Sequence, residues 1–136
     1  MTTRTITQDR RPAITLSDRD RARLTSLANA ALARLPDEAE FLLDEIERAR
    51  IVGADAAPDD LVRMGSAVTF RVDDGEIRRA TLVYPEDADF AAGRISILTP
   101  VGAALIGLST GQSIAWTRRD GSLRRVEVLA VESPHA

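Results

Sequence analysis

Two stretches near the amino terminus carry apolar residues at the spacing of an α-helix. The first begins at Ser17, whose hydroxyl is placed to cap the amide of Asp20. Its apolar stripe consists of Leu24, Leu27, Ala28, Ala31 and Leu35. The second helix is predicted over about 37–51. Each pattern therefore predicts an amphipathic helix with one face that must leave water.

The link between these two helices is very short. Pro36 ends the first pattern, because proline disfavours helix in the residue before it, and it can open the next helix. Two amphipathic helices joined in this way fold back on each other, so the sequence predicts an antiparallel hairpin. At about 1.5 Å per residue, each arm is about 25 Å long.

The rest of the chain has the pattern of short strands separated by turns. A segment rich in glycine, alanine, proline and aspartate, 53–60, predicts a linker. The strands are predicted at 66–72, 77–84, 95–98, 113–118 and 123–132, the last near the middle of the sheet. The pairs Asp74-Gly75 and Asp120-Gly121 predict hairpin turns, because glycine accepts a positive φ.

One short helix is expected between the third and fourth strands. Thr99 is placed as its N-cap, and Pro100 fits its first turn because the amide that proline lacks would be unpaired there. Val101, Leu105 and Leu108 lie on one face. The predicted fold class is α+β: an N-terminal helical hairpin followed by a small sheet with one crossing helix.

Composition limits the function. The chain has 136 residues, 44% of them hydrophobic, which is enough for one core. With no cysteine, disulfides and thiol catalysis are excluded. A net charge of -3 argues against general or sequence-specific binding of nucleic acid. No run approaches the roughly 20 apolar residues that span a bilayer, so a cytoplasmic protein without membrane contact is expected.

Catalytic arrangements are not found in the sequence. The single histidine, His135, is second from the end, so neither a Ser-His-Asp set nor a histidine metal site is predicted. The glycines near the short helix lack the spacing of phosphate-binding loops. We therefore expect no enzymatic activity in isolation and no cofactor.

Two runs resemble known families. The run ISILTPVGAALIGLSTGQSI, 95–114, closely resembles the carboxy-terminal domain of the bacterial Gre transcript-cleavage factors. The run LVYPEDAD, 82–89, is similar to the Rnk regulators of nucleoside diphosphate kinase, which share that domain. The resemblance spans roughly 61–132 and implies an FKBP-like fold and binding to RNA polymerase. Prolyl isomerase activity, another property of that fold, is not expected because the chain has few aromatic residues.

The resemblance also implies a contact surface. In Gre factors the segment before the short helix contacts the rim of the polymerase secondary channel, and the matching positions are Thr99 and Pro100, with Ser96 close by in sequence. The acidic residue that Gre factors often carry just before this pair is Leu98 in this chain. Arg118 and Arg119 add positive charge at one hairpin end. The same residues can be explained without a contact: Thr99 and Pro100 cap the helix, and Arg118 and Arg119 are solvated charges on an edge strand.

The tip of the helical hairpin is acidic. Asp37, Glu38 and Glu40 cluster there. In Gre factors acidic residues at the coiled-coil tip help to hold a magnesium ion for RNA cleavage. The alternative is that carboxylates open the second helix because its dipole favours them there. We favour this alternative and predict no metal site, since the arms are much shorter than those of a Gre factor.

The sequence therefore predicts a tail (1–13), a hairpin forming a short coiled coil (14–52), a linker (53–60) and a Gre-like domain (61–136). The predicted function is that of a non-catalytic, Rnk-like regulator that binds RNA polymerase near its secondary channel. One alternative is a factor that stimulates transcript cleavage through its acidic tip. Another is an adaptor that regulates nucleoside diphosphate kinase or a different protein. Oligomeric state is not predicted.

Overall fold

The computed structural model describes residues 12–117 and 120–134. The helical elements are α2 (Asp18–Ala31), α3 (Pro36–Arg48) and α4 (Pro100–Leu105), with single 3-10 turns η1 (Ala54–Ala56), η2 (Pro85–Asp87) and η3 (Phe90–Ala92). The strands are β1 (Thr15–Ser17), β2 (Arg50–Val52), β3 (Ala67–Val72), β4 (Ile77–Val83), β5 (Arg94–Ser96), β6 (Ser113–Thr117) and β7 (Leu123–Glu132). The predicted tail lies outside the described residues as far as residue 11.

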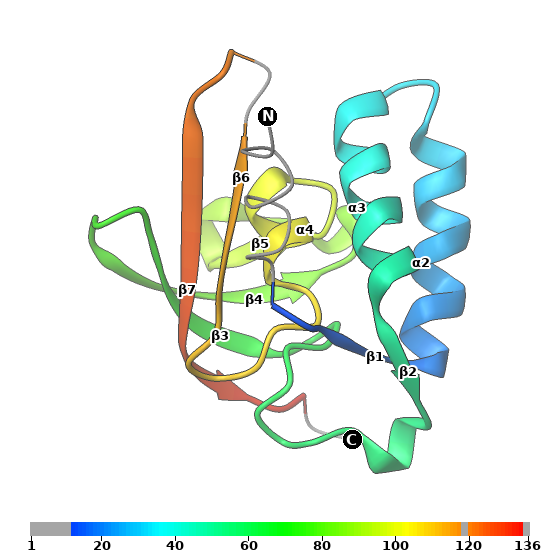
Figure 1. The fold of residues 1–136 in the computed structure, drawn as a ribbon, viewed down its shortest axis with the longest axis horizontal. Helices are drawn as coiled ribbons and strands as arrows, with labels where there is room; N and C mark the ends of the chain where they lie inside the picture. Colours follow the sequence, from blue (N-terminus) through cyan, green and yellow to red (C-terminus); the bar gives the residue numbers. More distant parts are fainter. Residues whose placement is uncertain (1–11, 118–119, 135–136) are drawn as a thin grey trace, which may run out of the picture.

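Helices α2 and α3 form the predicted antiparallel hairpin (Figure 1). The Ser17 hydroxyl accepts a hydrogen bond from the Asp20 amide at 3.1 Å, and Pro36 occupies the first turn of α3. With 14 and 13 residues, the two helices are each about 20 Å long. The hairpin is therefore slightly shorter than the sequence pattern predicted.

The predicted end of the second helix at residue 51 is wrong. Helix α3 ends at Arg48, and the next residues form β2, which pairs in parallel with β1 in the register Leu16 to Ile51. The Arg50 amide donates to the Ile14 carbonyl at 2.9 Å, so backbone pairing with a distant segment replaces a further helical turn. Strands β1 and β2 thus close the hairpin at its base.

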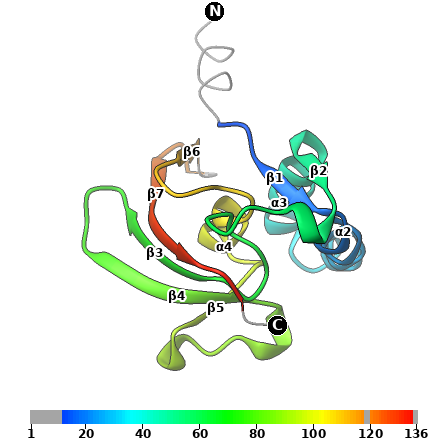
Figure 2. The ribbon, with the colours of Figure 1, turned by 90° about the horizontal axis from the view of Figure 1, so that it is seen from below.

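The main sheet has five strands in the order β5-β4-β3-β7-β6. Strand β3 is antiparallel to both β4 and β7, β6 is antiparallel to β7, and β5 runs parallel to β4. Strand β7 therefore lies inside the sheet, as predicted. The sheet curls around α4, which lies on its concave side (Figure 2). This confirms an α+β fold with one short crossing helix, while its description as FKBP-like stays a prediction.

One predicted turn has a different geometry. At the β3–β4 turn the positive φ, 56°, belongs to Asp73 and not to Gly75. The Asp73 carboxylate accepts hydrogen bonds from the Arg125 amide at 3.0 Å and from Arg124 Nε at 2.9 Å, which holds the turn against β7. Aspartate tolerates the left-handed region better than most residues. At the second turn, Gly121 has the expected positive φ of 89°.

The hairpin and the sheet share one hydrophobic core. This core includes Leu24 and Ala28 of α2, Leu42 and Ile46 of α3, Leu105 of α4, and Val68, Leu82 and Val126 of the sheet. The Phe41 ring of α3 lies 5.8 Å from the Trp116 ring of β6, centroid to centroid. Helix α3 also packs directly on α4. The hairpin consequently lies along the sheet domain and does not project freely from it (Figure 1).

Candidate functional site

The loop between β5 and α4 is closed by its own hydrogen bonds. The Ser96 hydroxyl accepts from the Leu98 amide at 3.0 Å. The Thr99 hydroxyl donates to the Ser96 carbonyl at 2.7 Å and accepts from the Gly102 amide at 3.1 Å, as the predicted N-cap. Residues 96–102, which we call the capping loop, therefore have one fixed backbone conformation.

Helix α4 is shorter than its sequence pattern predicted. It ends at Leu105, and Leu108 follows a left-handed Gly107 with φ of 83°. Leu108 is nevertheless fully buried, because the chain turns back into the core after the helix. The strand before the capping loop also ends early, at Ser96, while Ile97 and Leu98 stay buried in the loop.

The capping loop presents only part of the predicted contact set to solvent. Ser96 and Thr99 are half-buried and engaged in the loop, whereas Pro100 is exposed. Leu98 is only 6% exposed, so an apolar residue suits the position where Gre factors often carry an acid. Arg118 and Arg119 lie outside the described residues. Of the predicted contacts, Pro100 is thus the most accessible one that the structure describes.

A groove of about 620 Å³ adjoins the capping loop. Its wall includes Val101, the residue after Pro100, together with Phe70, Ala80 and Ile95. Phe90 lies at this groove and is 83% exposed. The charged lining residues are Glu76, Arg78, Arg79, Arg94 and Arg124. The sequence did not indicate this groove, because its residues come from β3, β4, β5, β7, α4 and the loop around η3.

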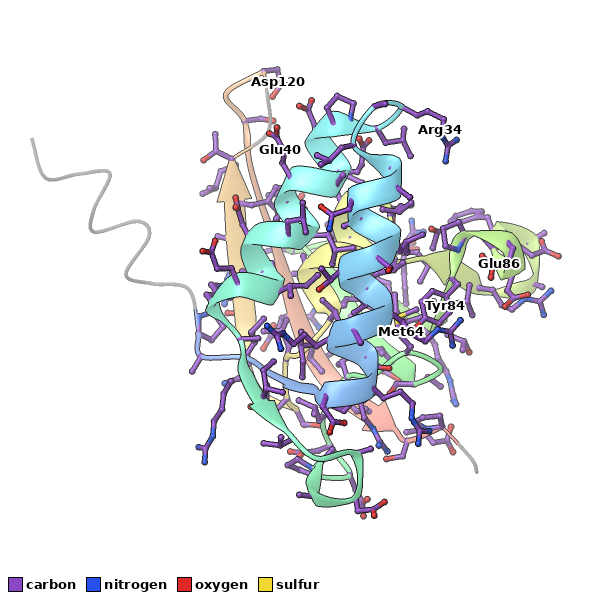
Figure 3. The ribbon with its side chains drawn as sticks, turned by 90° about the vertical axis from the view of Figure 1, so that its right-hand side faces the viewer. Arg34, Glu40, Met64, Tyr84, Glu86 and Asp120 are labelled. Atoms are coloured by element: carbon purple, nitrogen blue, oxygen red, sulfur yellow. The ribbon has the colours of Figure 1, made fainter. Side chains whose placement is uncertain are left out.

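The acidic hairpin tip is spread over the start of α3. Asp37 and Glu40 are exposed and Glu38 is half-buried. Within residues 12–117 and 120–134, no group of three or more acidic, histidine or cysteine side chains is placed to hold a metal ion. Glu40 and the Asp120 turn lie at the same end of the molecule (Figure 3). The tip therefore carries the negative charge that is preferred at a helix N-terminus, and its described residues do not form a metal-binding group.

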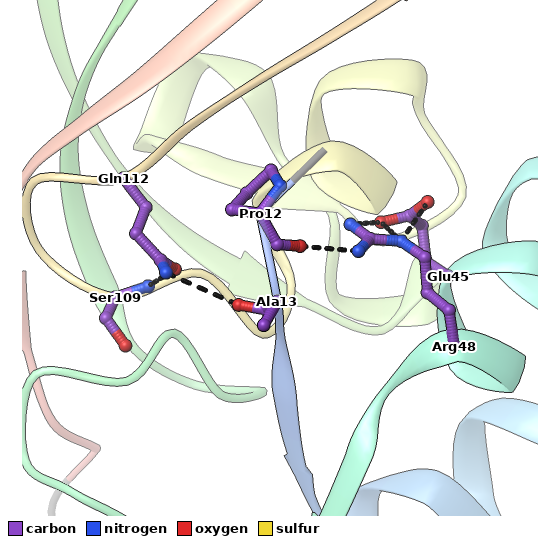
Figure 4. A network of polar contacts seen from close by, with 6 residues as sticks. All are labelled: Pro12, Ala13, Glu45, Arg48, Ser109 and Gln112. Atoms are coloured by element: carbon purple, nitrogen blue, oxygen red, sulfur yellow. Dashed lines mark hydrogen bonds and ion pairs between the residues drawn. The ribbon is translucent and has the colours of Figure 1, made fainter. Parts of the chain in front are cut away.

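A buried ion pair fixes the entry to the hairpin. Glu45 is fully buried, and Arg48 Nε lies 3.1 Å from each of its carboxylate oxygens. The other side of the guanidinium donates from Nη1 to the Pro12 carbonyl. Beside it, the Gln112 side chain accepts from the Ser109 amide and donates to the Ala13 carbonyl (Figure 4). Residues 12 and 13, predicted as the end of a tail, are held at this point.

A second pocket lies where α2 meets the sheet. We call it the seam pocket; it is lined by Ser17, Arg19, Asp20, Arg23, Ala54, Arg63, Met64, Gly65, Leu82, Val83, Tyr84, Asp87 and Pro134. The Asp20 carboxylate accepts from the Met64 amide at 3.2 Å, and the Arg23 guanidinium lies 4.2 Å from the centre of the Tyr84 ring. Met64 and Tyr84 both lie beside α2 (Figure 3). Sequence reasoning missed the seam pocket because its residues come from five separated segments.

Burial in the seam pocket raises the pKa of the Asp20 carboxyl above its ordinary value of 3.8. The Met64 amide and the positive charges of Arg63, Arg23 and Arg19 oppose this effect. A raised folded-state pKa means that the folded chain binds this proton more tightly than the unfolded chain does. The stability that Asp20 contributes therefore falls as the pH rises from 3.8 through the folded value.

We expect Asp20→Asn to be more stable than the wild type at pH 7. Asparagine retains an oxygen for the Met64 amide and has no charge to bury. The advantage should shrink as the pH falls toward 3.8, because the folded wild-type carboxyl then takes up its proton and no longer carries a buried charge. Urea unfolding of both proteins between pH 4 and pH 7 measures this difference in the free energy of unfolding. A stability difference that does not change with pH would contradict a role for the Asp20 charge.

Comparison with known proteins shows the class of this chain. The model of the transcription elongation factor GreA/GreB C-terminal region matches residues 57–133, and the model of the Rnk N-terminus matches residues 12–52. The chain therefore belongs to the GreA/GreB family. Both family predictions from the sequence are confirmed.

Within this family the chain is of the Rnk type. It is 41% identical over 124 residues to the regulator of nucleoside diphosphate kinase of Escherichia coli (strain K12), an alignment that covers 90% of each. It is 35% identical over 75 residues to the transcription elongation factor GreA of Nitratidesulfovibrio vulgaris (strain DSM 19637 / Miyazaki F), covering 47% of that factor. The chain thus matches about half of GreA and nearly all of the Rnk-type regulator.

A solved structure supports the same assignment. The prokaryotic transcription elongation factor GreA/GreB from Nitrosomonas europaea superposes with a TM-score of 0.69 at 38% identity, covering 89% of this chain and 98% of that one. These relatives are regulators and elongation factors. Among the described residues, no helix has the length and apolar character needed to cross a membrane.

Proposed function

We propose that this chain is a non-catalytic transcription regulator that docks on RNA polymerase near the secondary channel. The observation that carries the proposal is the capping loop. Within the region matched by the GreA/GreB model, it presents an exposed Pro100 on a fixed backbone, beside a groove with a largely exposed Phe90. A rigid apolar surface of this kind loses little entropy on binding a protein partner.

The groove suits an acidic segment with an apolar side chain. Four arginines and one glutamate line it. Arg94 and Arg124 already pair with Asp89 and Asp73, whereas Arg78 forms no ion pair with another described residue. Arg78 is thus available to a partner carboxylate, while the exposed ring of Phe90 supplies apolar contact. Such charge complementarity acts mainly on specificity and association rate.

The mechanism in this proposal is occupancy of the channel. Arms of about 20 Å, closed at the base by β1 and β2, limit how far the tip reaches. Asp37, Glu38 and Glu40 then face the channel as charge and do not hold a catalytic ion. The proposal includes an FKBP-like half-barrel at 61–136, a linker at 53–60, a short coiled coil at 14–52 and a cytoplasmic location.

Titration against bacterial core RNA polymerase tests the docking surface. We expect Pro100→Arg and Phe90→Ser each to weaken binding at least tenfold, equivalent to about 1.4 kcal/mol. Both side chains are exposed, so the melting temperature should stay close to that of the wild type. Pro58→Arg, an exposed site in the 53–60 segment, is the matched control and should bind normally.

Two results would overturn this function. Wild-type protein that does not bind core polymerase at micromolar concentration contradicts it, as does unchanged binding by both surface variants. A stalled-complex assay with Mg²⁺ should show no stimulation of RNA cleavage. Cleavage that Asp37→Ala abolishes would instead support the cleavage-factor alternative.

A second candidate function follows from the relative that is 41% identical, which is named a regulator of nucleoside diphosphate kinase. Titration of the same protein preparation against purified nucleoside diphosphate kinase distinguishes the two candidate functions. Binding to the kinase that Phe90→Ser leaves intact, with no binding to polymerase, would favour the second candidate.

A further inference from the structure

Three arginines converge on the seam pocket without acidic partners of their own. Arg19 and Arg23 come from α2, and Arg63 comes from the segment before β3. Within the described chain, none of the three forms an ion pair at 4 Å or less, although all three act electrostatically on Asp20. Three arginines against the two aspartates Asp20 and Asp87 leave the pocket with a net positive charge, so this arrangement favours an anion.

Two buried donors in the same pocket lack acceptors. The Tyr84 hydroxyl and Arg63 Nε are both shielded from solvent and form no hydrogen bond. Leaving a buried polar group unsatisfied costs about 1–3 kcal/mol. Burial also raises the pKa of the Tyr84 phenol above 10.0, so its hydroxyl remains protonated and can donate. An acceptor oxygen that displaced the atoms covering these two groups would satisfy both of them.

We propose that the seam pocket binds a small organic phosphate. Phosphate presents several acceptor oxygens in a tetrahedral arrangement, which suits donors arriving from different directions, and guanidinium groups bind it in bidentate fashion. The pocket volume of about 340 Å³ lies within the usual range for small-molecule sites, about 300–1,000 Å³. Met64, Leu82 and Pro134 supply apolar wall for the organic part of the ligand.

The two aspartates of the pocket limit the affinity without reversing the preference. Asp20 already accepts from the Met64 amide, and Asp87 is exposed on η2. Opposed to them are three guanidinium groups and the phenol hydroxyl. The remaining oxygen of Asp20 is available to a hydroxyl on the organic part. The seam pocket is independent of the proposed polymerase contact, whose residues lie in the capping loop and its groove.

Binding in the seam pocket would connect the hairpin to the sheet. Arg19 and Arg23 belong to α2, whereas Tyr84 follows β4 and Arg63 precedes β3. A phosphate held by both sides adds an interaction that exists only when the hairpin lies against the sheet. Its occupancy therefore raises the stability of the folded, closed arrangement by mass action.

Calorimetric titration with inorganic phosphate and with ribose 5-phosphate, in buffer containing about 150 mM NaCl, tests the proposal. We expect ribose 5-phosphate to bind more tightly than inorganic phosphate, because only it uses the apolar wall. Tyr84→Phe should bind at least about fivefold more weakly while melting at or above the wild-type temperature, since it removes a buried donor that lacks a partner. Asp20→Asn should bind more tightly, because it removes a negative charge.

Arg23→Gln and Arg21→Gln form a matched pair. Both remove one positive charge from α2, but Arg21 does not line the seam pocket. Only Arg23→Gln should weaken binding, by at least about fivefold. An equal loss in both variants would mean a general response to charge, and would overturn the site. Failure of the wild-type protein to bind either ligand at millimolar concentration would overturn it as well, whatever the result with polymerase.

Discussion

Gly102→Ala is expected to destabilise the chain by about 3–5 kcal/mol, which is large for a single substitution. An added Cβ would lie 2.2 Å from the Ser96 carbonyl oxygen, far inside van der Waals contact. The Ser96 carbonyl group cannot easily move away, because its oxygen accepts hydrogen bonds from both the amide and the hydroxyl of Thr99. At roughly 3 °C per kcal/mol for a chain of this size, the melting temperature should fall by about 10 °C or more.

Gly53→Ala is the control for this prediction. No atom lies within 4 Å of its added Cβ, and its φ of -64° suits any residue. The control should melt at or slightly above the wild-type temperature, since alanine restricts the unfolded chain. Calorimetry of the three proteins measures the effect. If Gly102→Ala melted like Gly53→Ala, the capping loop would be more adaptable than its hydrogen bonds indicate.

Arg48→Met is expected to cost about 3 kcal/mol. The substitution keeps much of the apolar stem but removes the charge facing the fully buried Glu45, and removing one member of a buried pair typically costs about 3–5 kcal/mol. It also removes the hydrogen bond to the Pro12 carbonyl, which holds the chain entering β1. Urea denaturation should show a lower midpoint with a similar slope.

The double variant Glu45→Gln with Arg48→Met tests whether the unpaired charge of Glu45 causes the loss of stability. Neutralising Glu45 should return part of the lost stability, so the two substitutions should be far from additive. Arg50→Met, which changes an exposed arginine two residues further along, should be close to neutral. A cost for Arg48→Met that persists unchanged in the double variant would show that packing, and not charge, explains it.

Local signals in the sequence predicted most of the secondary structure. The Ser17 and Thr99 caps and the Pro36 start of α3 depend on residues at most three positions apart, so they can be recognised directly from the chain. Features that depend on distant partners were missed. Strand β2 continues the apolar pattern of α3, and only its pairing with β1 makes it a strand. The left-handed Asp73 depends likewise on Arg125 of β7.

The candidate sites also differ in how far the sequence could predict them. The capping loop was predicted because its sequence is contiguous and resembles a known family. The seam pocket was not, because Arg23, Arg63 and Tyr84 are separated along the chain and none belongs to a recognisable motif. The acidic tip shows the opposite case: its residues are adjacent in sequence, yet within the described chain they form no metal-binding group. Proximity in sequence therefore predicted the cap geometry of the loop, whereas the contact role of the loop and of the tip stays a prediction.

The pairing of β1 with β2 fixes the base of the hairpin at the end opposite to its tip. Helix α2 begins directly after β1, α3 ends just before β2, and these two strands pair with each other, so residues inserted around 32–35 would extend the arms without changing the base or the sheet. Each full turn added to both arms moves the tip outward by about 5.4 Å. Evolution or design can thus change how far the acidic end extends while the proposed docking surface stays the same.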